Sequence, residues 1–187
     1  MIKNHNEIFD EWLVLRCQTG DKKAMDLLVK SWHPKLLKQG YWHTRDSEAA
    51  KDIAQECWPH IIRGINTIQD PAHFRVWVYR IVYRRAVDWI REREKNRLKE
   101  ENSKEIKKEH TAGNDEGQED RIKMMRKQLQ LLPNDQRIIL SMFYLNNQTI
   151  REIAKIMSLP VGTVKSRLFH AREHLKKNLN KMNYEKL

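Results

Sequence analysis

The feature that most constrains this chain is a 30-residue stretch near its middle that cannot join a hydrophobic core. Residues 91–120 contain 18 charged side chains and no aromatic residue. A segment of this composition buries too little apolar surface to offset the conformational entropy lost when a chain becomes ordered. Its second half includes TAGNDEG at 111–117, a sequence that ends any helix continuing from upstream. We therefore predict two small domains, residues 1–95 and 122–187, joined by a flexible charged linker over 96–121.

Both flanking segments are predicted to be helical, so the expected fold class is all-α. Six glycines and five prolines in 187 residues are too few for a turn-rich β fold. A proline at position 59 predicts a kink or a break in one helix. Apolar residues recur at helical spacing in the first segment. The expected helices are built around Ile8, Phe9, Trp12, Leu13 and Leu15; around Ala24, Leu27, Leu28, Val29 and Trp32; around Ala50, Ile53, Ala54, Trp58, Ile61 and Ile62; and over residues 74–97.

The second segment is predicted to contain a helix-turn-helix. A first helix is expected to end near Leu132 and Pro133, and a second includes residues 138–144. A short helix over 150–157 follows, for which Thr149 supplies a capping hydroxyl. Residues 158–160 then form a turn, and a longer helix runs from Val161 to about Leu179. Two helices joined by three or four residues, with basic side chains on the second, are typical of DNA-binding domains.

Positive charge is concentrated in this second segment. The chain carries a formal net charge of +11, and residues 121–187 hold 14 basic and 4 acidic side chains. Such an excess favours a polyanionic partner, and nucleic acid is the expected one. The helix over 74–97 is rich in arginine, which binds phosphates and bases through two parallel hydrogen bonds. For that helix, a merely solvated face remains the alternative.

The sequence offers little support for a membrane protein, a metal-binding protein or an enzyme. Because no apolar run approaches the length of a membrane span and residues 1–10 do not resemble a signal peptide, we expect a cytoplasmic protein without membrane insertion. Cys17 and Cys57 are expected to be buried thiols, and Cys57 with His60 lacks further ligands for a metal. Asp52 and Glu56 share a helix face without a positioned base, which indicates a protein-binding patch. We expect no enzyme activity, no cofactor and no metal site.

Three sequence strings in the second domain, and three in the first, closely resemble a known family. LPNDQR at 132–137, TIREIA at 149–154 and PVGTVKSRLFHAREHL at 160–175 resemble region 4 of bacterial extracytoplasmic-function (ECF) sigma factors. AAKDIAQECW at 49–58 resembles the polymerase-binding segment of region 2 in that family. FRVWVYRI at 74–81 and RAVDWIR at 85–91 resemble the helix that follows the promoter-melting loop. Lys51, Trp58 and Arg84 depart from the family pattern.

The resemblance implies an alternative sigma factor that binds core RNA polymerase, recognises the −35 and −10 elements of promoter DNA and promotes strand opening. It also implies an anti-sigma factor as a further partner. Residues assigned to the polymerase are Asp52, Gln55 and Glu56. Residues assigned to the −10 element and the DNA upstream of it are Asn66, Gln69, His73, Arg80, Arg84 and Arg85. Residues assigned to the −35 element are Gly162, Thr163, Lys165, Ser166, Arg167, Phe169, His170 and Arg172.

Within these sets we expect particular roles. Lys165, Ser166, Phe169 and His170 should read base edges or thymine methyl groups, while Arg167 and Arg172 bind phosphates. The loop over 66–73 is the candidate pocket for an unstacked base, unless its amides only cap the neighbouring helices. Among the tryptophans we assign Trp12, Trp32, Trp58 and Trp77 to the core and leave Trp42 and Trp89 open.

Two other functions fit the same residues. One is a helix-turn-helix repressor or activator that acts without replacing a sigma factor and binds a symmetric operator. The other is an interaction protein that uses this fold to sequester a regulator without binding DNA. Addition of the protein to core polymerase, followed by a search for new transcription start sites, separates all three functions.

Overall fold

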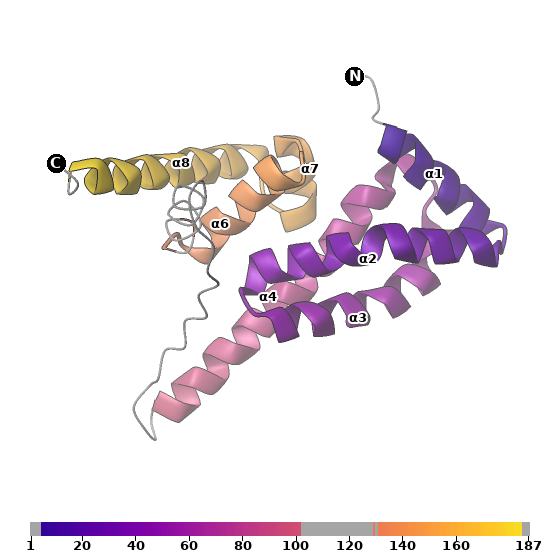
Figure 1. The fold of residues 1–187 in the computed structure, drawn as a ribbon, viewed down its shortest axis with the longest axis horizontal. Helices are drawn as coiled ribbons and strands as arrows, with labels where there is room; N and C mark the ends of the chain where they lie inside the picture. Colours follow the sequence, from indigo (N-terminus) through magenta and orange to yellow (C-terminus); the bar gives the residue numbers. More distant parts are fainter. Residues whose placement is uncertain (1–4, 102–128, 130, 185–187) are drawn as a thin grey trace. The chain divides into compact units, whose positions relative to one another are not determined.

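The computed structural model describes residues 5–101, 129 and 131–184 (Figure 1). Within these ranges every regular element is helical and no strand occurs, which confirms the all-α prediction. Contacts divide the chain into two compact units, one built mainly from the elements up to Arg91 and the other mainly from the helices after residue 131. Most of the predicted linker lies outside the described residues.

The first unit contains four helices and two short 3-10 turns. They are α1 (His5–Gln18), α2 (Lys22–Thr44), α3 (Ser47–Gly64), η1 (Ile65–Thr67), η2 (Pro71–His73) and α4 (Phe74–Glu101). The side chain of Asp21 accepts hydrogen bonds from the backbone amides that open α2, and Asp46 does the same for α3. These carboxylates satisfy amides that have no partner inside the helix, so each helix begins where the sequence supplies a cap.

The core of this unit lies between α2 and the helices around it. α2 packs against both α1 and α3. A Cβ atom added to Gly40 would lie 3.1 Å from the Cα atom of Ala50, so α2 and α3 approach closely at that point. Trp32 is buried, and its ring meets the ring of Phe74 edge-on with centroids 5.1 Å apart. This aromatic contact joins α2 to the start of α4.

One prediction for this unit is narrowed and another is wrong. Of the kink or break expected at Pro59, the break does not occur, because α3 continues through this residue to Gly64. The orientation of α1 also differs, because its inner face carries Leu13, Val14 and Cys17. The apolar residues turned outward are Ile8, Phe9, Trp12 and Leu15, together with Leu27 on α2 and Ile62 on α3.

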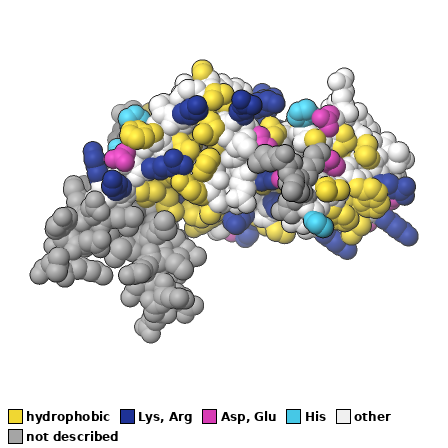
Figure 2. All heavy atoms as spheres, turned by 90° about the horizontal axis from the view of Figure 1, so that it is seen from above, with side chains coloured by type: hydrophobic (Ala, Val, Ile, Leu, Met, Phe, Trp, Pro, Cys, Tyr) yellow, Lys and Arg dark blue, Asp and Glu magenta, His cyan; other side chains and the backbone are white. Residues whose placement is uncertain are grey.

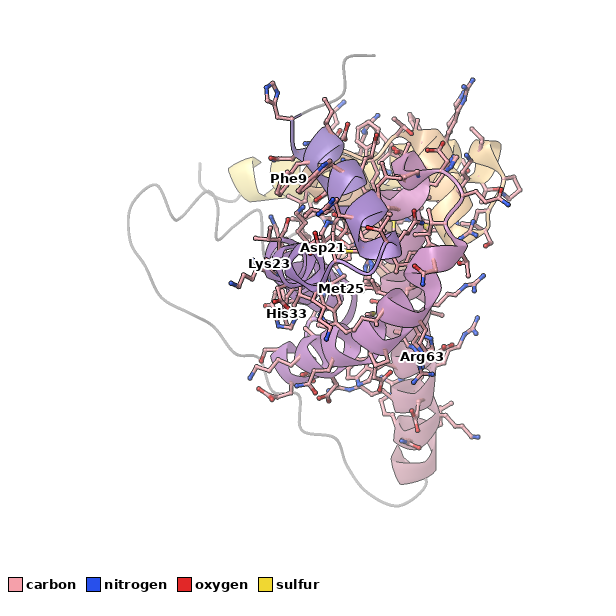
Figure 3. All side chains as sticks on the ribbon, turned by 90° about the vertical axis from the view of Figure 1, so that its right-hand side faces the viewer. Phe9, Asp21, Lys23, Met25, His33 and Arg63 are labelled. Carbon is pink, nitrogen blue, oxygen red and sulfur yellow. The ribbon has the colours of Figure 1, made fainter. Side chains whose placement is uncertain are left out.

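Trp12 therefore does not belong to the core: 49% of its surface is exposed. Its ring stacks on that of Phe9, which is labelled on α1 in Figure 3, with centroids 5.9 Å apart. Trp32 is buried as expected, whereas Trp58 and Trp77 are half-buried. The error has a physical cause: α1 has apolar residues on both faces, so helical periodicity alone cannot select the inner one.

The second unit contains α6 (Asn134–Leu140), the π-helical turn η3 (Ser141–Leu145), α7 (Ile150–Met157) and α8 (Val161–Tyr184). The helix predicted before Leu132 lies largely outside the described residues. α6 packs against α8. The predicted helix-turn-helix is confirmed, with α7 at the expected bounds and α8 longer than expected at its C-terminal end.

Both cysteines are buried free thiols, as predicted. Burial raises the pKa of the Cys57 thiol to about 12, and burial also raises the pKa of Cys17. In the described ranges no helix is both long and apolar enough to cross a membrane. Among the same residues, no three His, Cys, Asp or Glu side chains converge as metal ligands would.

Candidate nucleic-acid and polymerase-binding surfaces

Helix α7 opens with a reciprocal set of hydrogen bonds between Thr149 and Glu152. The backbone N–H of Glu152 donates to Oγ1 of Thr149 at 3.2 Å. In return the Glu152 carboxylate accepts from the backbone N–H and the hydroxyl of Thr149, at 2.7 and 2.8 Å. This capping box satisfies otherwise unpaired donors and fixes the first turn of the helix. The predicted cap at Thr149 is thus confirmed.

The turn between α7 and α8 depends on one residue in the left-handed region. Ser158 has φ of 55°, and the N–H of Leu159 donates to the carbonyl of Ala154 at 3.0 Å. This bond closes the end of α7 and reverses the chain. The first α8 bond follows at once, from the N–H of Val164 to the carbonyl of Pro160 at 3.1 Å.

An apolar seam determines which side of α8 is free. Ile153 on α7 is fully buried, as are Val164 and Ala171 on α8, and Leu168 is nearly so. Gly162 is exposed with open space around its Cα, while Thr163 is half-buried. The opposite face of α8 can therefore reach a ligand.

The four proposed base readers all lie on that free face. Lys165, Ser166 and His170 are exposed, and 60% of the surface of Phe169 is exposed. The rings of Phe169 and His170 meet edge-on with centroids 5.6 Å apart. The Ser166 hydroxyl donates to the carbonyl of Thr163 at 3.0 Å, so it bonds its own helix in the absence of DNA. The predicted orientation of the helix is confirmed, and the reading of bases stays a prediction.

The two arginines assigned to phosphates are held by the preceding helical segment. Nη1 of Arg167 lies 2.7 Å from Oδ2 of Asp135. Nε of Arg172 donates to the hydroxyl of Tyr144 at 2.9 Å, and its guanidinium lies 5.3 Å from the centroid of the Phe143 ring. These partners orient both arginines at the edge of α8 before any ligand binds. Sequence reasoning missed all three partners, because they lie about 30 residues away and no local pattern joins them to α8.

The loop between α3 and α4 is built from the turns η1 and η2. Oδ1 of Asp70 accepts from the N–H of Ala72 at 2.9 Å, and the Thr67 hydroxyl donates to the carbonyl of Gly64 at 2.7 Å. The sequence left open that Asn66 and Gln69 only cap the neighbouring helices. In the structure Thr67 and Asp70 make these capping bonds instead. Both amide side chains are exposed and make no hydrogen bond within the described part of the chain. They remain available to an exposed base edge.

His73 and the ends of the loop are also anchored. Nδ1 of His73 lies 3.3 Å from Oδ2 of Asp70. At the start of the loop, a Cβ atom on Gly64 would lie 2.6 Å from the Trp77 ring, so only glycine lets that ring approach. Nε2 of Gln18 donates to the carbonyls of Ile65 and Ile68, at 2.9 and 2.8 Å. No feature of the sequence indicated that Gln18 or Gly64 shapes this loop.

Of the three α4 arginines that the sequence assigned to DNA, Arg84 is exposed and Arg80 and Arg85 are half-buried. Nη1 of Arg85 lies 3.5 Å from Oε2 of Glu56, and the guanidinium also contacts the ring of His60. The structure thus joins a residue assigned to DNA with one assigned to the polymerase. Figure 2 shows basic side chains at the surface with hydrophobic ones among them.

Asp52, Gln55 and Glu56 are exposed on α3, while Ile53 and Ala54 on the same helix are buried. The predicted polar strip is therefore present. Nζ of Lys51, where the family usually has an acid, lies 2.7 Å from Oε1 of Glu48. The hydrogen bond with Glu48 raises the pKa of Lys51. The departure at this position adds a cation that α3 itself partly neutralises.

Comparison with known proteins matches both parts of the chain to one family of proteins. Residues 28–96 match the family model described as Sigma-70 region 2, and residues 122–175 match the one described as Sigma-70, region 4. The fold is similar to RpoE of Bartonella quintana, solved with the anti-sigma factor NepR, with a TM-score of 0.70 at 19% identity over 84% of this chain and 98% of that one. It is also similar to CnrH, solved with the cytosolic domain of CnrY, with a TM-score of 0.66 at 19% identity over 92% and 98%.

Two named relatives align with almost the full length of this chain. The RNA polymerase sigma-H factor of Pseudomonas aeruginosa is 32% identical over 180 residues, which are 91% of this chain and 93% of that protein. The ECF RNA polymerase sigma-E factor of Escherichia coli K12 is 29% identical over 179 residues, 89% of this chain and 92% of that protein. With both sigma regions present in order and a relative of this identity along nearly all of its length, this chain belongs to the family of ECF RNA polymerase sigma factors.

Proposed function

We propose that this protein binds core RNA polymerase, recognises a −35 and a −10 promoter element, and helps open the DNA strands at the start of transcription. The observation that carries the proposal is the presence of both sigma regions in one chain. Sigma factors are DNA-binding initiation factors and not enzymes in themselves. The proposal places the protein in the cytoplasm, together with the polymerase.

The roles divide along the chain. Residues 1–95 bind the polymerase and the −10 element, residues 96–121 link the domains, and residues 122–187 bind the −35 element. In the first domain the strip of Asp52, Gln55 and Glu56 contacts the polymerase. Since Glu56 also lies beside Arg85, polymerase binding and DNA binding share one ion pair. An arginine released from this pair would gain a phosphate as its new partner.

In the second domain, α8 enters the major groove of the −35 element. The exposed face of α8 is supported by its buried seam, so its side chains meet the duplex without refolding. Lysine can bond guanine O6 and N7, serine can reach bases or phosphate, and an aromatic ring can contact a thymine methyl group. Arg167 and Arg172 lie on the side of α8 that faces α6 and η3, where phosphates flank the groove.

Strand opening is assigned to the loop over 66–73. Separation of one base from its neighbours costs a few kcal/mol of stacking, which a binding pocket must offset. Amide side chains can bond the exposed edge of such a base, and those of Asn66 and Gln69 point to solvent with no partner among the described residues. Arg80, Arg84 and Arg85 would then hold phosphates next to the opened segment.

An anti-sigma factor is proposed as a further partner. Two similar structures, RpoE and CnrH, were solved with NepR and with the cytosolic domain of CnrY, and the first of these ligands is an anti-sigma factor by name. Competition between such a protein and core polymerase would keep the sigma factor inactive until a signal releases it.

The decisive experiment adds the purified protein to core polymerase and maps transcription starts on fragments of genomic DNA. A sigma factor creates start sites that core polymerase alone does not use, and these starts share two sequence elements. A repressor or activator would instead bind duplex DNA without polymerase and create no new start. An absence of new starts together with tight binding to a symmetric site would replace this proposal with that alternative.

A further inference from the structure

The loop assigned to base capture is held by a side chain from a helix far away in sequence. Gln18, the last residue of α1, donates from Nε2 to the carbonyl of Ile65 at 2.9 Å and to the carbonyl of Ile68 at 2.8 Å. α1 packs against both η1 and η2. Figure 3 views this unit with α1 in front, and the labels Asp21 and Arg63 mark the turn after α1 and the end of α3.

The two carbonyls that Gln18 holds have a particular relation to the proposed binding residues. The carbonyl of Ile65 belongs to the peptide group that leads into Asn66, and that of Ile68 belongs to the one that leads into Gln69. A hydrogen bond to each carbonyl fixes the plane of its peptide group, and so the direction in which the next side chain leaves the backbone. One amide therefore orients both residues that would bond a captured base.

The turn needs this support. η1 has three residues, and its closing bond, from the N–H of Ile68 to the carbonyl of Ile65, is long at 3.3 Å. A single 3-10 turn has poor hydrogen-bond geometry and little stability of its own. The buried side chain of Ile65 anchors one end of the turn, whereas Asn66, Thr67 and Gln69 face solvent. Without Gln18 the peptide groups before Asn66 and Gln69 could rotate while the helices stayed in place.

We infer that Gln18 is a positioning residue for base capture: it presets the segment 65–69, which carries Asn66 and Gln69, and so contributes to the sequence preference at the opened part of the −10 element. The inference rests on the proposed role of the loop. A preset pocket loses less conformational entropy on binding than one that must first become ordered. Loss of Gln18 should thus weaken discrimination among bases more than it weakens the fold.

The test uses the full chain assembled with core polymerase. Gln18→Glu keeps the shape of the side chain but removes both donor hydrogens, and Gln18→Met removes all polar atoms. Gln18→Lys restores a side chain able to donate to two carbonyls. Thr19→Ala is the matched control, because the Thr19 hydroxyl bonds the carbonyl of Arg16 at 2.8 Å and not the loop. Thermal unfolding of each variant reports on the fold.

The probe is a fork-junction DNA derived from a mapped start site, with each of the four bases placed in turn at every single-stranded position of the −10 element. For Gln18→Glu and Gln18→Met, we expect the ratio of affinities for the best and worst base to fall by about tenfold at one position, as expected for the loss of two ordinary hydrogen bonds. Gln18→Lys should recover most of this ratio. Thr19→Ala should keep it, and a −35 duplex should bind all variants alike.

Two results would overturn the inference. One is an unchanged ratio in both donor-free variants, and the other is an equal loss for all four bases, which indicates a weakened domain rather than a misplaced turn. Asn66→Ala and Gln69→Ala distinguish this failure from that of the proposed function. If these two variants lose discrimination while the Gln18 variants keep it, only the role of Gln18 is wrong. If they too match the parent, base capture by the loop is wrong and the inference falls with it.

Discussion

Two surfaces proposed to touch bases, the exposed face of α8 and the loop over 66–73, are built in opposite ways. On α8 the proposed readers lie on a helix of 24 residues that packs against α6 and whose other face carries buried apolar residues. In the loop Asn66 lies in a turn of three residues and Gln69 follows it, and one side chain of α1, that of Gln18, donates to the carbonyl before each of them. A duplex offers a rigid groove, which a rigid helix can match. A base that leaves the stack needs a pocket held by a few specific bonds.

The two surfaces differ in whether the residues that support them also hold the domain together. Apolar burial supplies the stability of the α8 surface, at about 25 cal/mol per Å² of area removed from water. The loop depends on hydrogen bonds that contribute about 1 kcal/mol each. Substitutions of the buried residues on the inner face of α8 should therefore unfold the second domain, and base recognition by α8 would be lost with the fold. Substitutions around the loop should leave the fold intact and change only the preference for bases.

The largest effect should follow from Leu168→Ala. Leu168 is buried on the inner face of α8, and removal of a buried leucine side chain costs about 2–5 kcal/mol of unfolding free energy. Thermal unfolding measures this loss. Phe169→Ala is the neighbouring control, since its exposed ring should leave stability within about 0.5 kcal/mol of the parent while −35 affinity falls. Equal losses of stability in the two variants would contradict the assignment of Leu168 to the core and of Phe169 to the surface.

Base readers and phosphate binders on α8 should differ in a binding matrix of protein and base variants. Lys165→Ala or His170→Ala should cost about 1–3 kcal/mol on the preferred −35 sequence and relax the preference at one base pair. Arg172→Ala should weaken all sequences alike, because a phosphate carries no sequence information. If Lys165→Ala and His170→Ala instead lose the same affinity on every sequence, α8 only holds the DNA backbone.

The polymerase strip should act mainly on polymerase binding, although the loss of Glu56 also releases Arg85. Asp52→Ala combined with Glu56→Ala should weaken binding to core polymerase by about tenfold, as expected for the loss of complementary charges at an interface. Binding titrations against labelled core polymerase measure this change, and circular dichroism should show intact helices. Lys51→Ala is the comparison on the same helix, since its charge is already paired with Glu48. Unchanged affinity in the double variant would remove the assignment.

The arginines of α4 should differ in salt dependence. Removal of one phosphate contact lowers the slope of log affinity against log salt by nearly one unit. We expect this change for Arg84→Ala on a fork-junction promoter. Arg85→Ala should give a smaller change, because Arg85 must first leave Glu56. Parental slopes in both variants would make these arginines a solvated face.

The smallest effect concerns Asp135, the partner of Arg167. An exposed ion pair contributes about 0–1 kcal/mol to stability, so Asp135→Asn should unfold at nearly the parental temperature. Release of Arg167 should raise the affinity for all duplexes slightly and make binding more sensitive to salt. A fall in affinity would show that Asp135 orients Arg167 rather than competing with phosphate for it.

The extent to which sequence predicted structure differs between the same two regions. In the second unit, the Thr149 cap, the bounds of α7 and the exposed side of α8 all follow from local signals, which are a capping residue, a turn and one apolar stripe. In the first unit, the loop was located but its anchors were not. Gln18 lies 47 residues before Ile65, and no periodic pattern links an amide to a carbonyl at that separation.

Sequence by itself determined the helical fold, the division into two domains and the helix-turn-helix. These properties depend on composition, on the 3.6-residue period and on capping within a few residues, all of which act locally. The family followed from the resemblance of whole sequence strings to a known one, which needs no structure. Only the tertiary structure decided that Trp12 faces outward, that Arg167 and Arg172 have partners on the preceding helical segment, and that Gln18 holds the loop. Each of these depends on which surfaces meet after folding, and contacts between distant residues leave no periodic mark in a single sequence.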